Sequence, residues 1–202
     1  HSDYQFIGCS SNSIMMHLKE VLSDLVREGY DYTSFQVMAP MYRGLNGIDN
    51  INRELQKILN PKSKEKGEYT YGNITYRDND KVIQLVNVPD DGVYNGDIGI
   101  IIQINKASLS ESGKTEIYVD YEGNIVKYLP QNFNQLRHAF AISIHKAQGS
   151  EFDTVIIPMC PSYQRMLYRK LIYTGVTRAK DKLCIVGDPN AFAFSIKNSN
   201  EY

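Results

Sequence analysis

The sequence predicts an α/β protein, with a parallel sheet covered by helices and interrupted by a small all-β insertion. Two patterns support this prediction. Before residue 61 and after residue 130, strand-like apolar runs alternate with helical repeats, whereas the stretch between them alternates apolar and polar residues at period two. The chain has 202 residues, 42% of them hydrophobic, which suffices for one medium-sized domain with a smaller one attached.

The first part of the chain alternates strand and helix. Apolar residues recur at helical spacing from Ile14 to Val26, where Ser11 or Ser13 can cap the helix and Gly29 can end it. The strand-like YQFIG precedes that helix, the buried strand FQVMAP follows it, and IDNINRELQKIL then predicts a second amphipathic helix. This order is typical of a parallel sheet with helices on its faces.

The middle of the chain has a different pattern of residues. A charged segment, PKSKEKGE, follows the second helix, and the residues beyond it are punctuated by DND, PDDG, NGD, SESG and YEGN, which are hairpin signals. The runs KVIQLVNV, DIGIIIQI, TEIYVDY and NIVKYL predict four or five short strands, enough for a small barrel. We therefore expect a discontinuous domain at 3–65 and 131–202, and an insertion at 66–130.

The last part of the chain returns to the α/β pattern. The expected elements, in order, are a strand at LRHAFAISI, a turn and short helix at HKAQGSEFD, a strand at FDTVIIP, a helix at SYQRMLYRKLIYTGVTRAK, a strand at KLCIVGD and a helix at PNAFAFSI. HKAQGSEFD, residues 145–153, places an imidazole, an amine, an amide and carboxylates between two buried strands. Taken alone, a plain turn is its simplest explanation.

Composition argues against several classes of protein. A formal net charge of −1 and a pI near 6.5 disfavour a free-standing basic nucleic-acid binder but leave room for a locally basic cleft. Cys9, Cys160 and Cys184 are odd in number and lack a CxxC spacing, so neither a disulfide framework nor a zinc site is expected, and a reducing cytoplasm fits best. No membrane span is expected, because no apolar run approaches roughly 18 to 20 residues.

Two local matches to nucleotide-binding motifs are better explained otherwise. Gly113, Lys114 and Thr115 match the end of the phosphate-binding loop G-x-x-x-x-G-K-[ST], but Ser108 stands where its first glycine belongs. That loop also requires a following helix, whereas TEIYVDY alternates like a strand, so a hairpin turn is predicted. Asp188 precedes a proline and a helix, where an N-cap is a commoner role than a magnesium ligand.

Three motifs taken together indicate a family. MAPMYRG, HKAQGSEFD and YTGVTRAK resemble the motor-domain signature of superfamily 1 helicases, and are most similar to the RecD-like branch, which carries I-H-K-[SA]-Q-G-S-E-F-D and Y-T-x-[VI]-T-R-A. YRDNDKVIQLVN and YNGDIGIII are similar to that family's barrel. Over nearly the whole chain, the resemblance implies a second RecA-like domain of the P-loop NTPase type, interrupted by an SH3-like β-barrel. A TraI-like or other neighbouring branch is the alternative.

The resemblance implies which residues contact the nucleotide. Arg178 resembles the arginine that reaches the ATP γ-phosphate from the far side of an interdomain cleft, and Arg43 resembles a second such arginine. Glu151 resembles a carboxylate at the ribose, Gly149 allows close backbone approach, and Gln148 of the same motif is also expected to contact the nucleotide. Taken singly, Arg178 is explained by a helix C-terminus, Arg43 by a surface ion pair and Glu151 by an early helix position.

The resemblance also implies contacts to single-stranded DNA. Ser143, His145 and Lys146 lie at a strand end where the family tracks the DNA backbone, and hydroxyl and cationic groups suit phosphate contacts. The family usually has threonine at position 143, and a helix cap is the alternative role for His145. Stacking on bases and simple strand propensity are both explanations for the tyrosines of the insertion, and propensity is favoured; these are Tyr69, Tyr71, Tyr94, Tyr118 and Tyr121.

The implied function is that of the C-terminal motor domain of an ATP-dependent DNA helicase moving 5′ to 3′. ATP and Mg2+ are the implied cofactors, with the magnesium ligands in an N-terminal RecA-like domain missing from this fragment; no metal site is expected in the chain itself. Because the phosphate-binding lysine loop and the acidic magnesium motif are absent from the sequence, the fragment alone is expected to be inactive.

Expected partners are single-stranded DNA, the missing N-terminal domain, and other recombination or repair proteins. Two alternatives stay open. The chain is a non-catalytic module whose barrel binds single-stranded nucleic acid or a protein, or it belongs to a superfamily 1 helicase that acts on RNA or in conjugation. Salt-dependent binding that needs residues 66–130 but not His145 and Lys146 would favour the binding module.

Overall fold

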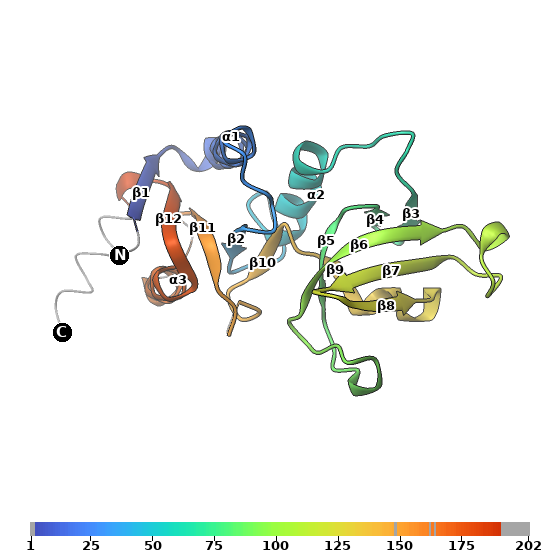
Figure 1. Cartoon of the computed structure of the whole chain (residues 1–202). Helices are drawn as coiled ribbons and strands as arrows, with labels where there is room; N and C mark the ends of the chain where they lie inside the picture. Colours follow the sequence, from blue (N-terminus) through green and yellow to red (C-terminus); the bar gives the residue numbers. More distant parts are fainter. Residues whose placement is uncertain (1–2, 148, 162, 164, 191–202) are drawn as a thin grey trace. The chain divides into compact units, whose positions relative to one another are not determined.

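The structure is a computed structural model and describes residues 3–147, 149–161, 163 and 165–190. The chain forms two compact units (Figure 1), one from the residues up to Leu59 and from Phe140 onward, the other from Asn60 to Ala139. The domain boundaries expected near residues 65 and 131 lie inside the second unit. Asn60 and the strand Leu136–His138 belong to it because they hydrogen-bond within it.

The first unit is built on a five-stranded sheet in which every neighbouring pair of strands is parallel. In spatial order its strands are β1 (Asp3–Gly8), β12 (Ala179–Gly187), β11 (Phe152–Met159), β2 (Phe35–Ala39) and β10 (Ala141–Ser143). Strand β2 is buried along its whole length and β11 along nearly all of it, as expected where both faces are covered. The predicted fold class is confirmed.

The helices that pack on this sheet, within the described residues, are α1 (Ile14–Arg27), α2 (Ile48–Leu59) and α3 (Arg165–Arg178). Figure 1 shows α1 and α2 on one face of the sheet and α3 on the other. Helix α1 ends at Arg27, and the predicted stop signal, Gly29, follows its C-cap with a φ of +95° and donates its N–H to the carbonyl of Val26. Ser13 occupies the N-cap position, but its hydroxyl donates to the carbonyl of Ser10 instead of accepting a helix N–H.

The second unit is antiparallel throughout its described strands, which confirms the predicted all-β insertion. A five-stranded sheet has the order β8 (Asn124–Tyr128), β7 (Glu116–Tyr121), β6 (Ile98–Asn105), β5 (Lys81–Gln84) and β9 (Leu136–His138), and β3 (Glu68–Tyr71) pairs with β4 (Ile74–Arg77). The G-K-T sequence lies in the β6–β7 connection, where Gly113 has a φ of +72°. A strand follows it, so the predicted hairpin is confirmed.

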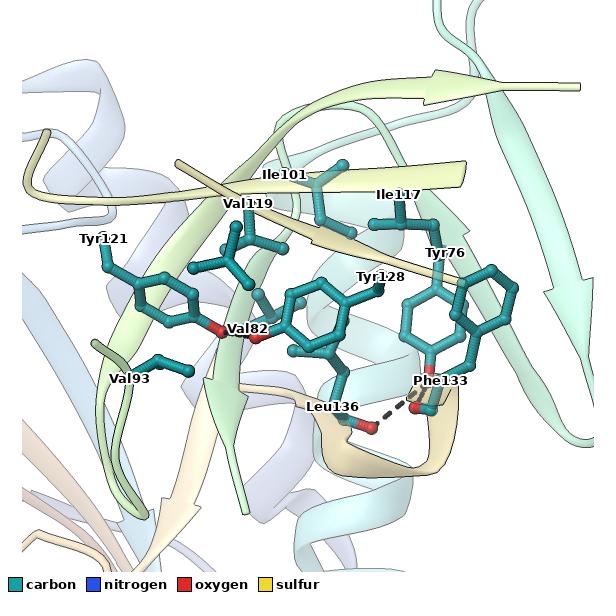
Figure 2. Close-up of a cluster of buried hydrophobic side chains, with 11 residues drawn as sticks. Tyr76, Val82, Val93, Ile101, Ile117, Val119, Tyr121, Tyr128, Phe133 and Leu136 are labelled. Atoms are coloured by element: carbon teal, nitrogen blue, oxygen red, sulfur yellow. Dashed lines mark hydrogen bonds between the residues drawn. The ribbon is translucent and has the colours of Figure 1, made fainter. Parts of the chain in front are cut away.

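Aliphatic and aromatic side chains form the core of the second unit (Figure 2). Phe133 is fully buried, and the rings of Tyr69, Tyr71 and Tyr76 meet it at centroid distances between 5.6 and 6.1 Å. The hydroxyl of Tyr76 donates to the carbonyls of Phe133 and Leu136 at 3.0 and 3.2 Å. Packing around Phe133 therefore accounts for the buried Tyr76 and the half-buried Tyr69, whereas Tyr71 also leaves 42% of its surface exposed.

Two further tyrosine hydroxyls meet inside this core (Figure 2). Tyr128 donates its single proton to Oε1 of Gln84 at 2.6 Å, so Tyr121 is the donor in the 2.6 Å bond between the two hydroxyls. Burial raises the pKa of Tyr128 to about 12. Burial, followed by its donation to Tyr128, also raises the pKa of Tyr121. Both phenols stay neutral in the folded protein where tyrosines of the unfolded chain, with a pKa of about 10, ionise.

We expect the second unit to lose stability above about pH 10, the pKa of tyrosine in an unfolded chain. A group whose folded pKa is raised contributes its full stability below the unfolded pKa and loses it as the pH rises to the folded pKa, which is about 12 for Tyr128. Each such tyrosine adds a slope of about 1.4 kcal/mol per pH unit. In the Tyr121→Phe variant the free energy of unfolding should therefore fall less steeply with pH than in the wild type. The difference between the two slopes should be about 1.4 kcal/mol per pH unit.

Urea unfolding at several alkaline pH values measures this slope. The matched control is Tyr94→Phe, because Tyr94 lies on the same unit but is 48% exposed. Its slope should equal that of the wild type. If Tyr121→Phe also kept the wild-type slope, the buried pair would not be the source of the alkaline sensitivity.

LRHAFAISI, predicted as one strand, is divided between the two units. Strand β9 pairs antiparallel with β5 in the second unit, whereas β10 pairs parallel with β2 in the first. Ala139 and Phe140 separate the two strands. The prediction of a single strand was wrong because periodicity does not distinguish one long strand from two short ones that join different sheets.

The C-terminal third differs from expectation in two further places. Residues 144–147 and 149–151 form turns and irregular backbone instead of including a short helix. Helix α3 ends at Arg178, and the next two residues, expected in the helix, begin β12.

The expected helix at PNAFAFSI starts at Pro189, and Oδ1 of Asp188 accepts the N–H of Asn190 at 2.8 Å, as an N-cap does. The rest of that segment, from residue 191 onward, lies outside the described residues. Of the helices in the described part of the chain, none has the length and apolar character needed to span a membrane.

Candidate functional site

Three candidate residues lie at the carboxyl end of β10, which pairs with β2 through Ser143 and Ala39. Ser143 is 3% exposed, and its Oγ accepts the N–H of Lys146 at 3.2 Å. Its carbonyl also accepts the N–H groups of Lys146 and Ala147. Ser143 thus closes the turn that presents His145, which is exposed, and Lys146, which is half-buried.

Arg43 lies beyond the carboxyl end of β2, in the loop of residues 40–47 that leads into α2. The loop is tightly folded: the N–H of Gly47 donates to the carbonyl of Gly44, and a Cβ at position 47 would lie 2.4 Å from the carbonyl oxygen of Arg43. The N–H groups of Ile48 and Asp49 donate to the carbonyls of Met41 and Tyr42 at 2.8 and 3.1 Å, which folds the loop back onto the start of α2. The Arg43 side chain is exposed, and no described carboxylate forms an ion pair with it.

Arg178 lies at the other end of the strands, just before β12. Phe152 and Ala179 are register partners, so the residues that precede them are brought together although they are far apart in the sequence. Nη1 of Arg178 donates to the carbonyl of Ser150 at 3.2 Å. Two of the three motifs, HKAQGSEFD and YTGVTRAK, therefore meet at the amino end of the sheet.

Glu151 and Gly149 lie at the same amino end of the sheet as Arg178. Oε2 of Glu151 lies 3.9 Å from Nζ of Lys180, and both side chains are more than half exposed, which makes this a weak ion pair. Gly149 is exposed, has a φ of +83° and would have open space around a Cβ, so its backbone is accessible to a ligand. Glu151 lies outside any described helix, which removes the early-helix explanation for it. Gln148 lies outside the described residues.

Gly175 sets the position of α3, and hence of Arg178, although sequence reasoning did not single it out. A Cβ at this position would lie 2.7 Å from Cδ1 of Ile157 and 2.8 Å from Cδ1 of Leu183. The absence of a side chain lets α3 approach β11 and β12 closely. A glycine inside an otherwise helical pattern was the available signal for such a close approach.

The two candidate arginines thus lie at opposite ends of the strands. Strand β11 pairs with Ala179 through Phe152 and with Val37 through Ile156, and Arg43 follows only after β2 has ended. At about 3.3 Å per residue, the strands account for a separation of roughly 20 Å along the sheet. The sequence motifs alone do not reveal this separation.

Two sequence families match the chain. Residues 51–121 match the SH3 domain of ATP-dependent RecD-like DNA helicases, and residues 138–186 match the UvrD-like helicase C-terminal domain. The chain is 30% identical over 177 residues to the ATP-dependent RecD2 DNA helicase of Deinococcus radiodurans, covering 88% of this chain and 23% of that protein. It is 29% identical over 173 residues to the RecBCD enzyme subunit RecD of Buchnera aphidicola, covering 84% of this chain and 27% of that subunit.

The chain also matches a solved structure of two coordinating Pif1 helicases on forked double-stranded DNA. The match has a TM-score of 0.49 and 18% identity, and it covers 95% of this chain and 53% of the Pif1 chain.

The parallel sheet, the separate antiparallel unit and the two matched domains define the C-terminal region of a DNA helicase. Within that class, the chain belongs to the RecD-like helicases, and it is homologous to RecD2 and RecD proteins over most of its length. It spans about a quarter of the length of these curated relatives. The family predicted from the three motifs is confirmed.

Proposed function

We propose that the chain is part of the motor of an ATP-dependent DNA helicase, with a nucleotide-contacting group at the amino end of its parallel sheet and a strand-contacting group at the carboxyl end. The hydrogen bond between Arg178 and Ser150 carries this proposal, because it joins the two motifs that the nucleotide role requires. The polarity of movement, 5′ to 3′, rests on the family resemblance alone.

On the nucleotide side, Arg178 is the residue for the γ-phosphate. Nη1 donates to the Ser150 carbonyl and Nε donates to Oγ1 of Thr177 at 3.5 Å, which leaves the other N–H groups of the guanidinium, those of Nη2 included, for phosphate oxygens. Gly149 supplies accessible backbone, and Glu151, which is 60% exposed, supplies a carboxylate for ribose hydroxyls. A cation that meets charge developing on a transferred phosphoryl group lowers the barrier to its transfer.

The rest of the nucleotide site comes, in this proposal, from another RecA-like domain of the same protein. The sequence contains no G-x-x-x-x-G-K-[ST] loop, and the described residues contain no cluster of three or more metal-binding side chains. We therefore assign the phosphate-binding lysine and the ligands of Mg2+ to that other domain. On this view the chain alone does not turn over ATP.

On the DNA side, His145 and Lys146 are proposed to contact strand phosphates. Ser143, whose hydroxyl is buried in its own turn, is proposed to position them instead of touching DNA. We place Arg43 with this group as well, because its loop lies at the carboxyl end of β2, next to β10 and far from Arg178. In this proposal the two arginines serve different phosphates, as an alternative to the expectation that both reach ATP.

HKAQGSEFD connects the two groups. Its first residues follow the carboxyl end of β10 and its last two, Phe152 and Asp153, begin β11, so in this proposal one short segment joins the strand contacts to the nucleotide contacts. Closure on ATP would draw Arg178 toward the phosphate and shift this segment along the strand, and opening after hydrolysis would complete the step. This segment is therefore the proposed coupling element of the motor.

Salt-dependent binding of a single-stranded oligonucleotide by the chain tests the DNA-side assignment. For single strands, each lost phosphate contact lowers the slope of log affinity against log salt by about 0.7. We expect Lys146→Ala and Arg43→Ala each to lower the slope by about this amount. The matched control is Lys57→Ala on α2, where the lysine is 65% exposed and belongs to the same unit; its slope should match the wild type.

Other outcomes of this experiment separate the alternatives. Binding that disappears with residues 66–130 but survives Lys146→Ala and Arg43→Ala would identify the barrel as a binding module. Tighter binding to an RNA oligonucleotide of the same sequence would point to an RNA-directed helicase. If Arg43→Ala left the slope unchanged while ATP turnover of the full-length protein fell, Arg43 would belong to the nucleotide side after all.

A further inference from the structure

We propose that Asp80 is a positioning residue, which ties together the points where the chain enters and leaves the second unit. It lies in the turn between β4 and β5, within the sequence RDNDK of residues 77–81. In the sequence this stretch is a hairpin signal and no more. In the structure its side chains and backbone bind both chain crossings.

The point where the chain enters the unit is held by Asn60, which is 2% exposed. Its Nδ2 donates to Oδ1 of Asp80 and to the carbonyl of Asp78, each at 2.8 Å. Its own carbonyl accepts Nη1 of Arg77 at 2.8 Å. Three hydrogen bonds therefore fix the first residue of the unit to the RDNDK turn.

The point where the chain leaves is held by the same turn. Nε2 of His138, the last residue of β9, lies 2.8 Å from Oδ2 of Asp80. The N–H of Ala139 donates to the carbonyl of Lys81 at 2.8 Å. Because Asp80 accepts from Asn60 with one carboxylate oxygen and bonds His138 with the other, it keeps the two crossings side by side.

Burial makes this arrangement specific. Asp80 is 0% exposed and His138 is 8% exposed. Oδ2 of Asp80 also accepts the N–H of Arg77 at 2.8 Å, so both carboxylate oxygens have partners. A buried carboxylate that loses a donor bears a large desolvation cost, so breaking any of these hydrogen bonds is unfavourable. Bonds to a charged group are also stronger than those between neutral groups.

Beyond the second unit, two more buried polar side chains hold the residues that follow. Nε2 of Gln36 donates to the carbonyl of Phe140 at 3.2 Å. Asn52 of α2 makes two bonds to the backbone of Ala141, accepting its N–H at 2.7 Å and donating to its carbonyl at 3.0 Å. We call residues 138–143 the anchored segment, because bonds from buried side chains hold it from His138 to the strand β10, which ends at Ser143.

The part of the anchored segment that lies in the second unit, His138 and Ala139, is the part that Asp80 and Lys81 hold. Asp80 does not touch a substrate in this proposal. It acts through His138 on the point where the chain leaves the second unit.

Amide hydrogen exchange on the whole chain tests this role, comparing Asp80→Asn with the wild type. The asparagine keeps the size of the side chain, but its Nδ2 faces donors where an acceptor is needed. We expect exchange of the Ala139 amide to speed up by roughly tenfold or more, the scale of one lost buried bond to a charged group. Exchange of the Val119 amide, in the barrel core, should rise much less.

Asp97→Asn is the matched control. Its Oδ2 also accepts a backbone N–H, that of Tyr94 at 2.8 Å, but in a turn that touches neither crossing. It should leave the Ala139 amide unchanged. An equal acceleration at Ala139 and Val119 in Asp80→Asn would overturn the proposal, because Asp80 would then only stabilise the unit as a whole, and so would no acceleration at either.

If Asp80→Asn fails to fold, His138→Phe provides the second variant, because it removes the bond from His138 to Asp80 and keeps an aromatic ring beside Tyr76, which packs against the imidazole. The same selective acceleration at Ala139 is expected, and its absence would contradict the proposal. The measurement requires neither ATP nor DNA. Its outcome is therefore independent of the proposed function.

Discussion

Replacing Arg178 with alanine in the full-length protein is expected to lower ATP turnover by roughly a thousandfold or more, the scale on which arginine fingers act, and to leave single-stranded DNA binding largely intact. The reason is its location. Arg178 sits at the amino end of the sheet against the Ser150 carbonyl, whereas the proposed strand contacts lie at the carboxyl end. The measurements are steady-state ATP hydrolysis at saturating DNA and equilibrium oligonucleotide binding.

Two further variants sharpen this test. Arg178→Lys keeps the positive charge but loses the planar fork, so it should recover only part of the lost turnover. Arg27→Ala removes an arginine that is 75% exposed on α1 and pairs with Asp24, and it should change neither measurement. If turnover and DNA binding fell together in Arg178→Ala, the arginine would have to be reassigned to the strand or to the fold itself.

Phe133→Ala is expected to destabilise the second unit by about 3–5 kcal/mol, the usual cost of deleting a buried phenylalanine. Phe133 is fully buried, and three tyrosine rings pack against it, of which Figure 2 shows that of Tyr76. Truncation would remove the shared partner of those rings and leave a cavity. Part of the loss would also come from Tyr76, whose hydroxyl bonds the backbone of the same segment.

Residue-resolved hydrogen exchange distinguishes this effect from a general one. Amides of β7, such as Val119, should lose protection strongly, while those of β11, such as Val155, should keep theirs. Leu109→Ala is the control on the same unit, because Leu109 is 81% exposed and its truncation should cost no more than about 0.5 kcal/mol. Equal loss of protection in both units would mean that they unfold as one body.

Local patterns predicted the elements of this chain well where a helix or strand is long and regular. Helix α2 has the predicted bounds, since Ile48, Ile51 and Leu55 recur on one face and are all buried. Gly29 follows the C-cap of α1 because a glycine adopts the left-handed conformation that completes the helix end without a side-chain penalty. The motifs sufficed to predict the RecD-like family, because three spaced motifs in a given order are far more specific than any one of them.

Long-range arrangement was beyond the reach of these patterns. LRHAFAISI reads as one apolar run, but partner strands divide it between two sheets. RDNDK reads as a turn, and only the fold brings Asn60 and His138 to Asp80 from opposite ends of the unit. A periodicity reports which side of an element is buried and does not report what lies against it.

For the candidate site, the residue types alone specify the available chemistry: which residues are cationic, which are acidic, and which glycines leave the backbone open. The tertiary structure decided how they are grouped. It brings Arg178 to Ser150 and Glu151 at one end of the strands, and it sets Arg43 at the other end with Ser143, His145 and Lys146. The physical reason is that strand order and direction set these distances, and both arise from packing between segments far apart in the chain.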